Sequence, residues 1–293
     1  MRITSGQSYQ DLLRNLESIR ERMQRAQTEL TSGDKINQPS DDPAGAADLV
    51  RLTGEKSEID QYMSNAAAGK DRLDYADTVL SSVQSMVQRV ISLGESALGN
   101  PPNPASAYTT EIDGLRNQLV TAANTGFQGT SLFGGSVTNK PPYVVQADQS
   151  VTYQGNSTAN VVQVGRASTL QVQIPGNQVF SGSINVFNVV KQLSDAIKAG
   201  DKSGIQSQVT NLQQYYDSLS AVRSQIGALS NSAQTAQSDL QSYELARATD
   251  QSRIQSADLA QASTDFTQSQ TALQAAMAAG ARVSQVSILD YLR

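Results

Sequence analysis

The chain has 293 residues and a formal net charge of −5; 38% of it is hydrophobic, 5% is aromatic, and His, Cys and Trp are absent. The missing His and Cys exclude zinc and iron–sulfur sites, imidazole- or thiol-dependent catalysis and disulfides. The negative charge argues against a nucleic-acid or anionic-membrane surface, and no apolar run reaches the roughly 18 residues of a membrane span. The start, MRITSGQSYQDLLRN, lacks the apolar stretch of a cleaved secretory signal, so we expect none. Scarce aromatic bulk favours long helical packing over a compact enzyme core.

The N-terminal segment predicts a coiled-coil helix. Its apolar residues are separated by alternating gaps of three and four positions, as in a heptad repeat. They are Tyr9, Leu12, Leu16, Ile19, Met23, Ala26 and Leu30. We refer to such a row as an apolar seam.

A second, longer helix is predicted from residue 44 to about residue 98. The same gaps continue between Leu49 and Ala97, although Lys56 and Lys70 occupy two seam positions. Such a helix would be about 80 Å long at 1.5 Å per residue. The segment GNPPNP (99–104) ends it, and a shorter helix is expected around residues 112–122.

Between residues 143 and 182 the pattern changes to alternation of apolar and polar residues, punctuated by Gly and Pro. This period of two predicts short antiparallel strands. A β insert of about 40 residues is too small to be stable unless it packs against something else.

Helical periodicity resumes at residues 184–197, continues at 205–243 after the break KAGDKSG, and ends with a small-residue seam at 259–283. The layout is symmetrical about the insert. We therefore predict a mainly α fold: an elongated antiparallel helical bundle or coiled coil formed by the N- and C-terminal halves, with a small β-rich insert at its tip. The expected parts are 1–42 and 247–293 as the terminal coiled coil, 43–138 and 184–246 as a helical rod, and 139–183 as the insert.

The stretch LTSGDKINQPSDDPAGAADL (30–49) contains adjacent carboxylates and many turn residues. Asp42 followed by Pro43 is typical of a helix start, and Gly33 stands where a helix C-cap glycine is expected. Ser40 or Asp41 could share the capping, and a metal site is the alternative for the two acids. No further ligand lies at usable spacing, so we interpret this stretch as a helix-cap and hinge loop. Its key residues are Gly33, Asn37, Asp41, Asp42 and Pro43.

The same stretch resembles the N-terminal signature of the bacterial flagellin family. Pro43 after the two acids is more like the hook-associated members than filament flagellin. Four further segments resemble the same group, namely SLFGG (131–135), IPGNQVFSG (174–182), AVRSQIGAL (221–229) and SQVSILDYL (284–292). The resemblance extends over nearly the whole chain and is weak over residues 140–169.

This resemblance implies a structural junction protein without catalytic, metal or cofactor sites. Its implied partners are hook-associated protein 1 on the hook side, flagellin on the filament side, further copies of itself in a ring layer, and an export chaperone at the C-terminal region. It also implies type III export and an extracellular location at the hook–filament junction of the flagellum. The terminal seam would form the subunit interface, through Leu12, Leu16, Ile19, Met23, Leu30, Leu259, Phe266, Leu273, Met277, Val283, Leu289 and Leu292.

Three alternatives remain open from the sequence. Filament flagellin itself shares most of these features. A free-standing coiled-coil adaptor would instead form a stable helical dimer in isolation. An enzyme would need paired carboxylates, and the insert contains a single acid, Asp148.

Overall fold

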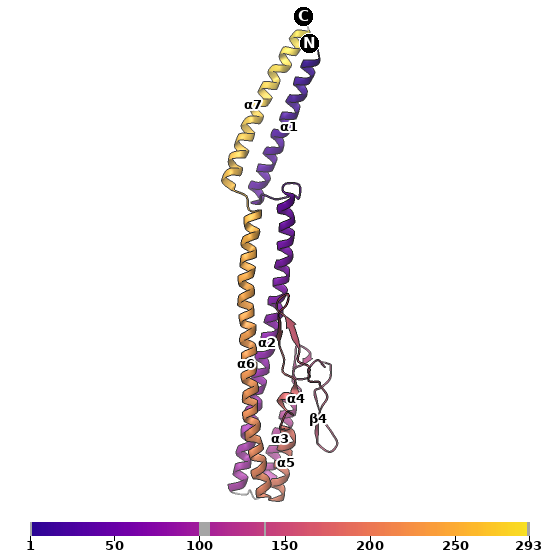
Figure 1. Cartoon of the computed structure of the whole chain (residues 1–293), viewed down its shortest axis with the longest axis vertical. Helices are drawn as coiled ribbons and strands as arrows, with labels where there is room; N and C mark the ends of the chain where they lie inside the picture. The colour runs from indigo at the N-terminus through magenta and orange to yellow at the C-terminus, as the bar shows by residue number, and fades with distance from the viewer. Residues whose placement is uncertain (1, 100–105, 138, 292–293) are drawn as a thin grey trace. The chain divides into compact units, whose positions relative to one another are not determined.

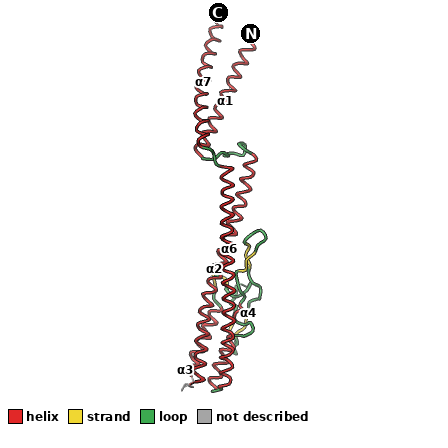
Figure 2. Tube along the Cα trace, turned by 60° about the vertical axis from the view of Figure 1, so that its left-hand side comes forward, coloured by secondary structure: helices red, strands yellow, loops and turns green. Residues whose placement is uncertain are grey.

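The computed structural model describes residues 2–99, 106–137 and 139–291. The chain divides into two compact units, each built mainly from helices (Figures 1 and 2). The terminal unit comprises Met1–Glu58 and Tyr243–Arg293, and the central unit comprises Ile59–Ser242. We describe each unit by itself.

The terminal unit contains two antiparallel helix pairs. Helix α1 (Arg2–Ser32) lies beside α7 (Leu259–Tyr291), and the first part of α2 (Pro43–Gly99) lies beside the last part of α6 (Lys202–Gln255). Ion pairs join the second pair, with Arg247 Nε 3.3 Å from Glu55 Oε2 and Lys56 Nζ 3.8 Å from Glu244 Oε1.

The central unit is a four-helix core. Its members are α2, α6, α3 (Ser106–Ala123) and α5 (Val186–Ala199). The largest apolar cluster joins them through Leu80, Val83, Val87, Val90, Ile112, Leu119, Val190, Leu193, Leu212 and Leu219. At the edge of this core, the Arg223 guanidinium spans α6 and α2 by donating to both carboxylate oxygens of Asp77, at 2.8 and 3.0 Å. Such a two-point contact fixes the alignment of the two long helices.

Local signals explain where α5 begins and ends. The side chain of Asn185 accepts a hydrogen bond from Asn188 N at 3.1 Å, which satisfies one free N–H of the first turn. Gly200 ends the helix at φ +67°, a left-handed conformation that glycine adopts without steric cost.

The described residues contain three separate antiparallel hairpins, of which the second and third lie in the β insert. They pair β1 (Gly126–Phe127) with β2 (Thr130–Ser131), β3 (Tyr143–Val145) with β4 (Val151–Tyr153), and β5 (Val161–Gln163) with β6 (Thr169–Gln171). Tyr143 lies opposite Tyr153, and Val161 lies opposite Gln171. One further helical turn, α4 (Gly176–Val179), follows the last strand.

Aromatic side chains hold the base of the insert against the helices. Tyr143 contacts the rings of Tyr153, Phe180 and Phe187 at centroid distances of 5.1 to 5.5 Å. The buried Arg116 of α3 donates from Nε to Phe187 O at 3.1 Å and from Nη2 to Gln149 O in the β3–β4 turn. The insert is therefore packed on the bundle and does not extend freely from it.

The position of the insert differs from the prediction. A second apolar cluster places Val164, Leu170 and Val172 of the β5–β6 hairpin against Ala66 of α2 and Ala233 of α6. Ala66 lies 33 residues before the end of α2, or roughly 50 Å along the helix. The insert thus lies along the side of the helices in the central unit, and not at their tip (Figures 1 and 2).

Small residues on the helices account for this lateral packing. A Cβ at Gly69 would lie 2.4 Å from Val172 Cγ1, so glycine lets the hairpin approach the α2 backbone. The helix flank offers the hairpin the apolar surface that so small an insert cannot supply for itself. The predicted helical bundle with a small β insert is confirmed. The β1–β2 hairpin and α4 were not expected.

Candidate functional site

The candidate site is the α1/α7 helix pair of the terminal unit, together with the loop that follows α1. A Cβ built at Gly280 of α7 would lie 3.0 Å from Leu12 Cδ2 of α1, near the beginning of α1. Near its end, Ala26 and Glu29 line a groove with Asp265 and Ser269. The two helices therefore run antiparallel, with contacts between residues 12–29 of α1 and residues 265–280 of α7.

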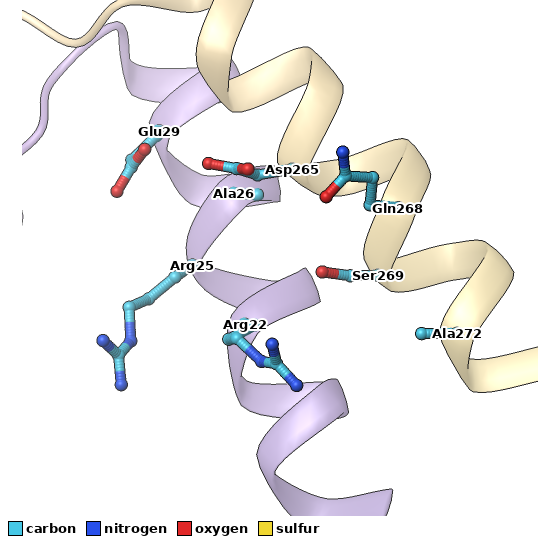
Figure 3. Close-up of a pocket in the computed structure, with 8 residues that line it drawn as sticks. All are labelled: Arg22, Arg25, Ala26, Glu29, Asp265, Gln268, Ser269 and Ala272. Carbon is cyan, nitrogen blue, oxygen red and sulfur yellow. The ribbon is translucent and has the colours of Figure 1, made fainter. Parts of the chain in front are cut away.

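Small, polar and charged residues surround the groove between α1 and α7. It is lined by Arg22, Arg25, Ala26, Glu29, Asp265, Gln268, Ser269 and Ala272. Asp265 and Ser269 point toward α1, whereas Arg25 points away from α7 (Figure 3). Charges of both signs thus stand beside a surface that another chain segment could approach closely.

The seam of this pair is only partly buried. Ile19, Ala26 and Ala262 have exposed fractions of 9%, 4% and 1%, whereas the core residues of the central unit are often fully buried. The other seam residues divide into two groups. Leu12, Leu16, Met23, Phe266 and Leu273 are half-buried, and Leu30, Leu259 and Met277 are exposed.

Three predicted seam residues follow Met277 in the chain. Leu292 and the side chains of Val283 and Leu289 lie outside the described residues. Among the residues that are described, apolar side chains project from both helices without complete cover. Burying a Leu or Phe side chain fully is worth about 1.5–3 kcal/mol relative to leaving it exposed, so this surface favours association.

Asp42 lies at the N-cap of α2. Its Oδ1 accepts a hydrogen bond from Gly45 N at 3.0 Å, and its carbonyl accepts one from Ala46 N at 2.8 Å. Pro43 is the first helical residue, where a missing N–H costs nothing because the helix would leave it unpaired. The carboxylate therefore serves the start of this helix.

Asp41 stabilises the loop itself. Its Oδ2 accepts hydrogen bonds from Asn37 N at 3.1 Å and Gln38 N at 2.8 Å. The side-chain Nδ2 of Asn37 in turn donates to Asp34 O at 2.8 Å. Gly33 ends α1 in the left-handed conformation, at φ +77°. The two acids have separate backbone partners, and no three acidic side chains of the described part of the chain gather as metal ligands would.

The sequence analysis missed two contacts of the terminal unit, one at the loop after α1 and one at the start of α7. Ile36 is buried with an exposed fraction of 9%, and Gly45 lies beneath it, so that a Cβ at Gly45 would lie 2.6 Å from Ile36 Cδ1. At the start of α7, Asp258 Oδ1 accepts from Ala260 N and Gln261 N at 3.0 and 3.1 Å. The Asp258 cap has a local signal, because Asp directly precedes a helical run; the Ile36–Gly45 contact has none.

The connectors at the two helix breaks are also bonded to each other. Lys35 N donates to Gln255 O at 2.7 Å, and Ala257 N donates to Gly33 O at 2.9 Å. The side-chain amide of Gln255 donates to Asp34 Oδ2 at 3.0 Å. These bonds join one protein segment to another. Among the described helices, none is long and apolar enough to cross a bilayer.

Two family models match the chain. The bacterial flagellin N-terminal helical region matches residues 3–138, and the bacterial flagellin C-terminal helical region matches residues 207–292. Together they cover most of the chain and include α1, α7 and the loop between α1 and α2.

Curated relatives include both hook-associated and filament proteins. Flagellar hook-associated protein 3 of Escherichia coli K12 is 22% identical over 319 aligned positions that cover 99% of each chain. The protein of that name from Salmonella typhimurium is 25% identical over 187 residues, covering 62% of this chain and 57% of that protein. Flagellin of Bacillus subtilis is 25% identical over 249 residues, or 79% of each chain.

Solved structures share the fold. A putative flagellar hook-associated protein from Vibrio parahaemolyticus has a TM-score of 0.69 at 21% identity, covering 74% of this chain and 100% of its own. Flagellar hook-associated protein 3 from Legionella pneumophila has a TM-score of 0.64 at 14% identity, covering 70% and 98%. The chain therefore belongs to the bacterial flagellin family and is a structural protein, not an enzyme.

Proposed function

We propose that this chain is a junction protein of the bacterial flagellum that joins the hook to the flagellin filament. The observation that carries the proposal is the half-covered seam of the α1/α7 pair in a chain that aligns end to end with a hook-associated protein 3. A helix pair with exposed apolar side chains gains burial when neighbouring subunits pack against it. The five-part division of the chain at residues 42, 138, 183 and 246 is part of the same proposal.

The partners follow from this role. Hook-associated protein 1 would contact the pair on the hook side and flagellin on the filament side, while copies of the chain would lie side by side in a ring layer. An export chaperone would cover the C-terminal helix before assembly, and the chain would reach the extracellular junction by type III export. The interface would include Leu30, Leu259 and Met277, the predicted seam residues that the α1/α7 contact leaves exposed.

A second candidate is filament flagellin itself. The alignment with the Bacillus subtilis flagellin over 79% of each chain favours it. The two candidates differ in where the protein lies: a junction protein is confined to one level of the flagellum, and a flagellin occurs along the whole filament.

Deletion of the gene tests the proposal. We expect cells with hooks but no filaments, and flagellin monomers released into the medium. Immunogold labelling of the complemented strain should mark one band between hook and filament. Filaments on the deletion strain would overturn the junction role, and label along the filament would establish the flagellin alternative.

Variants of the pair link the phenotype to the surface. Ile19→Asp places a charge in a largely buried apolar contact, at a cost of several kcal/mol, and should abolish filament attachment. Asn15→Asp adds the same charge at an exposed position of the same helix and should leave attachment intact. Equal motility of the two variants would show that this contact is not needed for assembly.

A further inference from the structure

The strands of the β insert lack the charges that commonly keep an edge strand from pairing with another molecule. Each hairpin has only two strands, so every strand has one side that faces no other strand. None of β3, β4, β5 and β6 contains a charged residue. In β3, Val144 and Val145 have exposed fractions of 38% and 47%. Uncharged strands rich in β-branched residues pair readily with strands of other chains, and a short strand only reduces this tendency.

The hydrogen bonds of the hairpin identify the backbone groups on the free side of β3. Gln146 N donates to Ser150 O at 2.8 Å, which places both residues on the inner side of the hairpin. Hydrogen-bonded pairs alternate along antiparallel strands, so Tyr143 and Val145 direct their N–H and C=O groups away from β4. These four groups are the ones that a further strand would bind.

Asn124, the residue after α3, covers half of this edge. Its Nδ2 donates to Tyr143 O at 2.8 Å, and Tyr143 N donates to its Oδ1 at 2.8 Å. A residue of a neighbouring strand would make the same two bonds with its backbone. The N–H of Asn124 bonds to Val120 O and Thr121 O at 3.1 Å, which holds the residue against the end of the helix. Among the described residues, the outward groups of Val145 have no hydrogen-bond partner.

A second asparagine on a helix lies at the free edge of β5. Val164 N donates to Ser168 O within that hairpin, so Gln163 directs its C=O outward. Asn65 Nδ2 of α2 donates to this oxygen at 2.8 Å. An amide side chain contains the same donor and acceptor groups as a peptide unit, so it can take the place of a strand.

We propose that Asn124 is an edge cap that prevents β3 from pairing with β3 of a second copy of the chain. Two such edges are complementary, because each presents a donor and an acceptor at Tyr143 and again at Val145. In an antiparallel pair centred on Val144, Tyr143 of each copy faces Val145 of the other. The two exposed Val144 side chains then lie side by side, which adds apolar contact. The proposal does not depend on the junction role of the chain.

Disulfide trapping in the full chain tests the proposal. The chain has no Cys, so a single introduced cysteine can form a disulfide only with another copy. In the proposed pair, the Cα atoms of the two Val144 residues would lie about 4.5 Å apart, which is within the range of disulfides. Val144→Cys therefore reports edge pairing. Val161→Cys, at an exposed position of β5, is the control for random collision.

Each cysteine is combined with a change at the cap. Asn124→Ala removes both partners of Tyr143, and Asn124→Asp places a carboxylate oxygen against Tyr143 O. Asn117→Asp is the matched control, because it makes the same change at an exposed position of α3. Circular dichroism melting monitors folding in every variant. Asn124→Ala introduces no charge, so it decides the question if Asn124→Asp unfolds.

We expect little disulfide dimer from Val144→Cys alone or with Asn117→Asp. With Asn124→Ala or Asn124→Asp, the dimer yield at the same protein concentration should rise on the order of tenfold, because Tyr143 loses its hydrogen-bond partners. The yield from Val161→Cys should not change. An unchanged yield at position 144 in folded Asn124→Ala would overturn the proposal. An equal rise at positions 144 and 161 would also overturn it, because general loosening of the insert would then explain the dimers.

Discussion

Gly45→Ala should disturb the loop that joins α1 to α2, although alanine favours helices. A Cβ at this position would lie 2.6 Å from Ile36 Cδ1 and 2.7 Å from Asp42 Oδ2, whereas carbon atoms in contact prefer about 3.5–4.0 Å. Both the buried Ile36 side chain and the Asp42 carboxylate that caps the helix must therefore shift. The substitution therefore affects two of the contacts that fasten the loop.

The magnitude follows from two opposing terms. Overpacking a buried contact costs about 1–3 kcal/mol, and replacing glycine with alanine inside a helix gains about 1 kcal/mol. We expect a net loss of up to about 2 kcal/mol for Gly45→Ala. Gly54→Ala is the matched control, because Gly54 is an exposed residue of the same helix with nothing near its Cβ position, and it should gain up to about 1 kcal/mol.

Hydrogen exchange read by mass spectrometry is the suitable assay, because it reports local opening of residues 33–45. Gly45→Ala should exchange faster there than wild type, and Gly54→Ala should not. Ile36→Val removes the Cδ1 atom that the new methyl group would meet, so the Gly45→Ala/Ile36→Val double variant should recover part of the protection. Equal protection in Gly45→Ala and Gly54→Ala, or no recovery with Ile36→Val, would refute the reasoning.

Three further outcomes are expected. Asp42→Ala should cost about 1 kcal/mol of helix stability in thermal melting, whereas Asp42→Asn should stay near neutral because Asn caps equally well. If a chelator lowered the wild-type melting temperature, the carboxylate would be binding a metal instead. Tyr215→Phe should raise the stability of the central unit by about 1 kcal/mol in urea unfolding, because the buried Tyr215 hydroxyl has no hydrogen-bond partner among the described residues. The same burial raises the pKa of this hydroxyl. Tyr143→Phe loses a hydrogen bond to Ser181 and should destabilise the unit instead. The ammonium of Lys70, followed by the hydroxyl of Ser230, lowers the pKa of the Asp74 carboxyl, so the stability that Asp74 contributes is present above about pH 4 and is lost as the pH falls further. Because the Asp74 side chain is 47% exposed, solvent screening reduces the effect to a fraction of a kcal/mol. Melting at pH 7 and pH 3 should show a smaller acid loss for Asp74→Asn than for wild type.

Helix starts and stops were predictable from the sequence because their causes are local. Asp42 lies within four residues of the N–H groups that it accepts from, Pro43 occupies the first helical position, where no N–H is needed, and Gly33 requires only its own backbone angle. The same reasoning would have identified Asp258 at the start of α7.

The side-chain contacts across the loop and the insert were not predictable in this way. Ile36 meets Gly45 through a turn whose path depends on many hydrogen bonds, and Gly69 meets Val172 across about a hundred residues of chain. Periodicity placed Leu30 and Leu259 on the seam, but they lie at the ends of their helices next to the connectors, where the opposite helix gives them little cover. Repeats in a sequence indicate which face of a helix is apolar, and the chain path decides how much of that face is covered.

Because the β insert lies beside the helices, the length and the width of the central unit depend on different parts of the chain. The length along the α2 and α6 axes depends only on the number of residues in those helices, because no strand interrupts either of them. The hairpins add width beside Ala66 and Ala233 without adding to that length. Residues could therefore be gained or lost in the hairpin turns while the axial spacing of the helices stays the same. In a protein that stacks in layers, such changes would alter the outer surface and leave the height of each layer untouched.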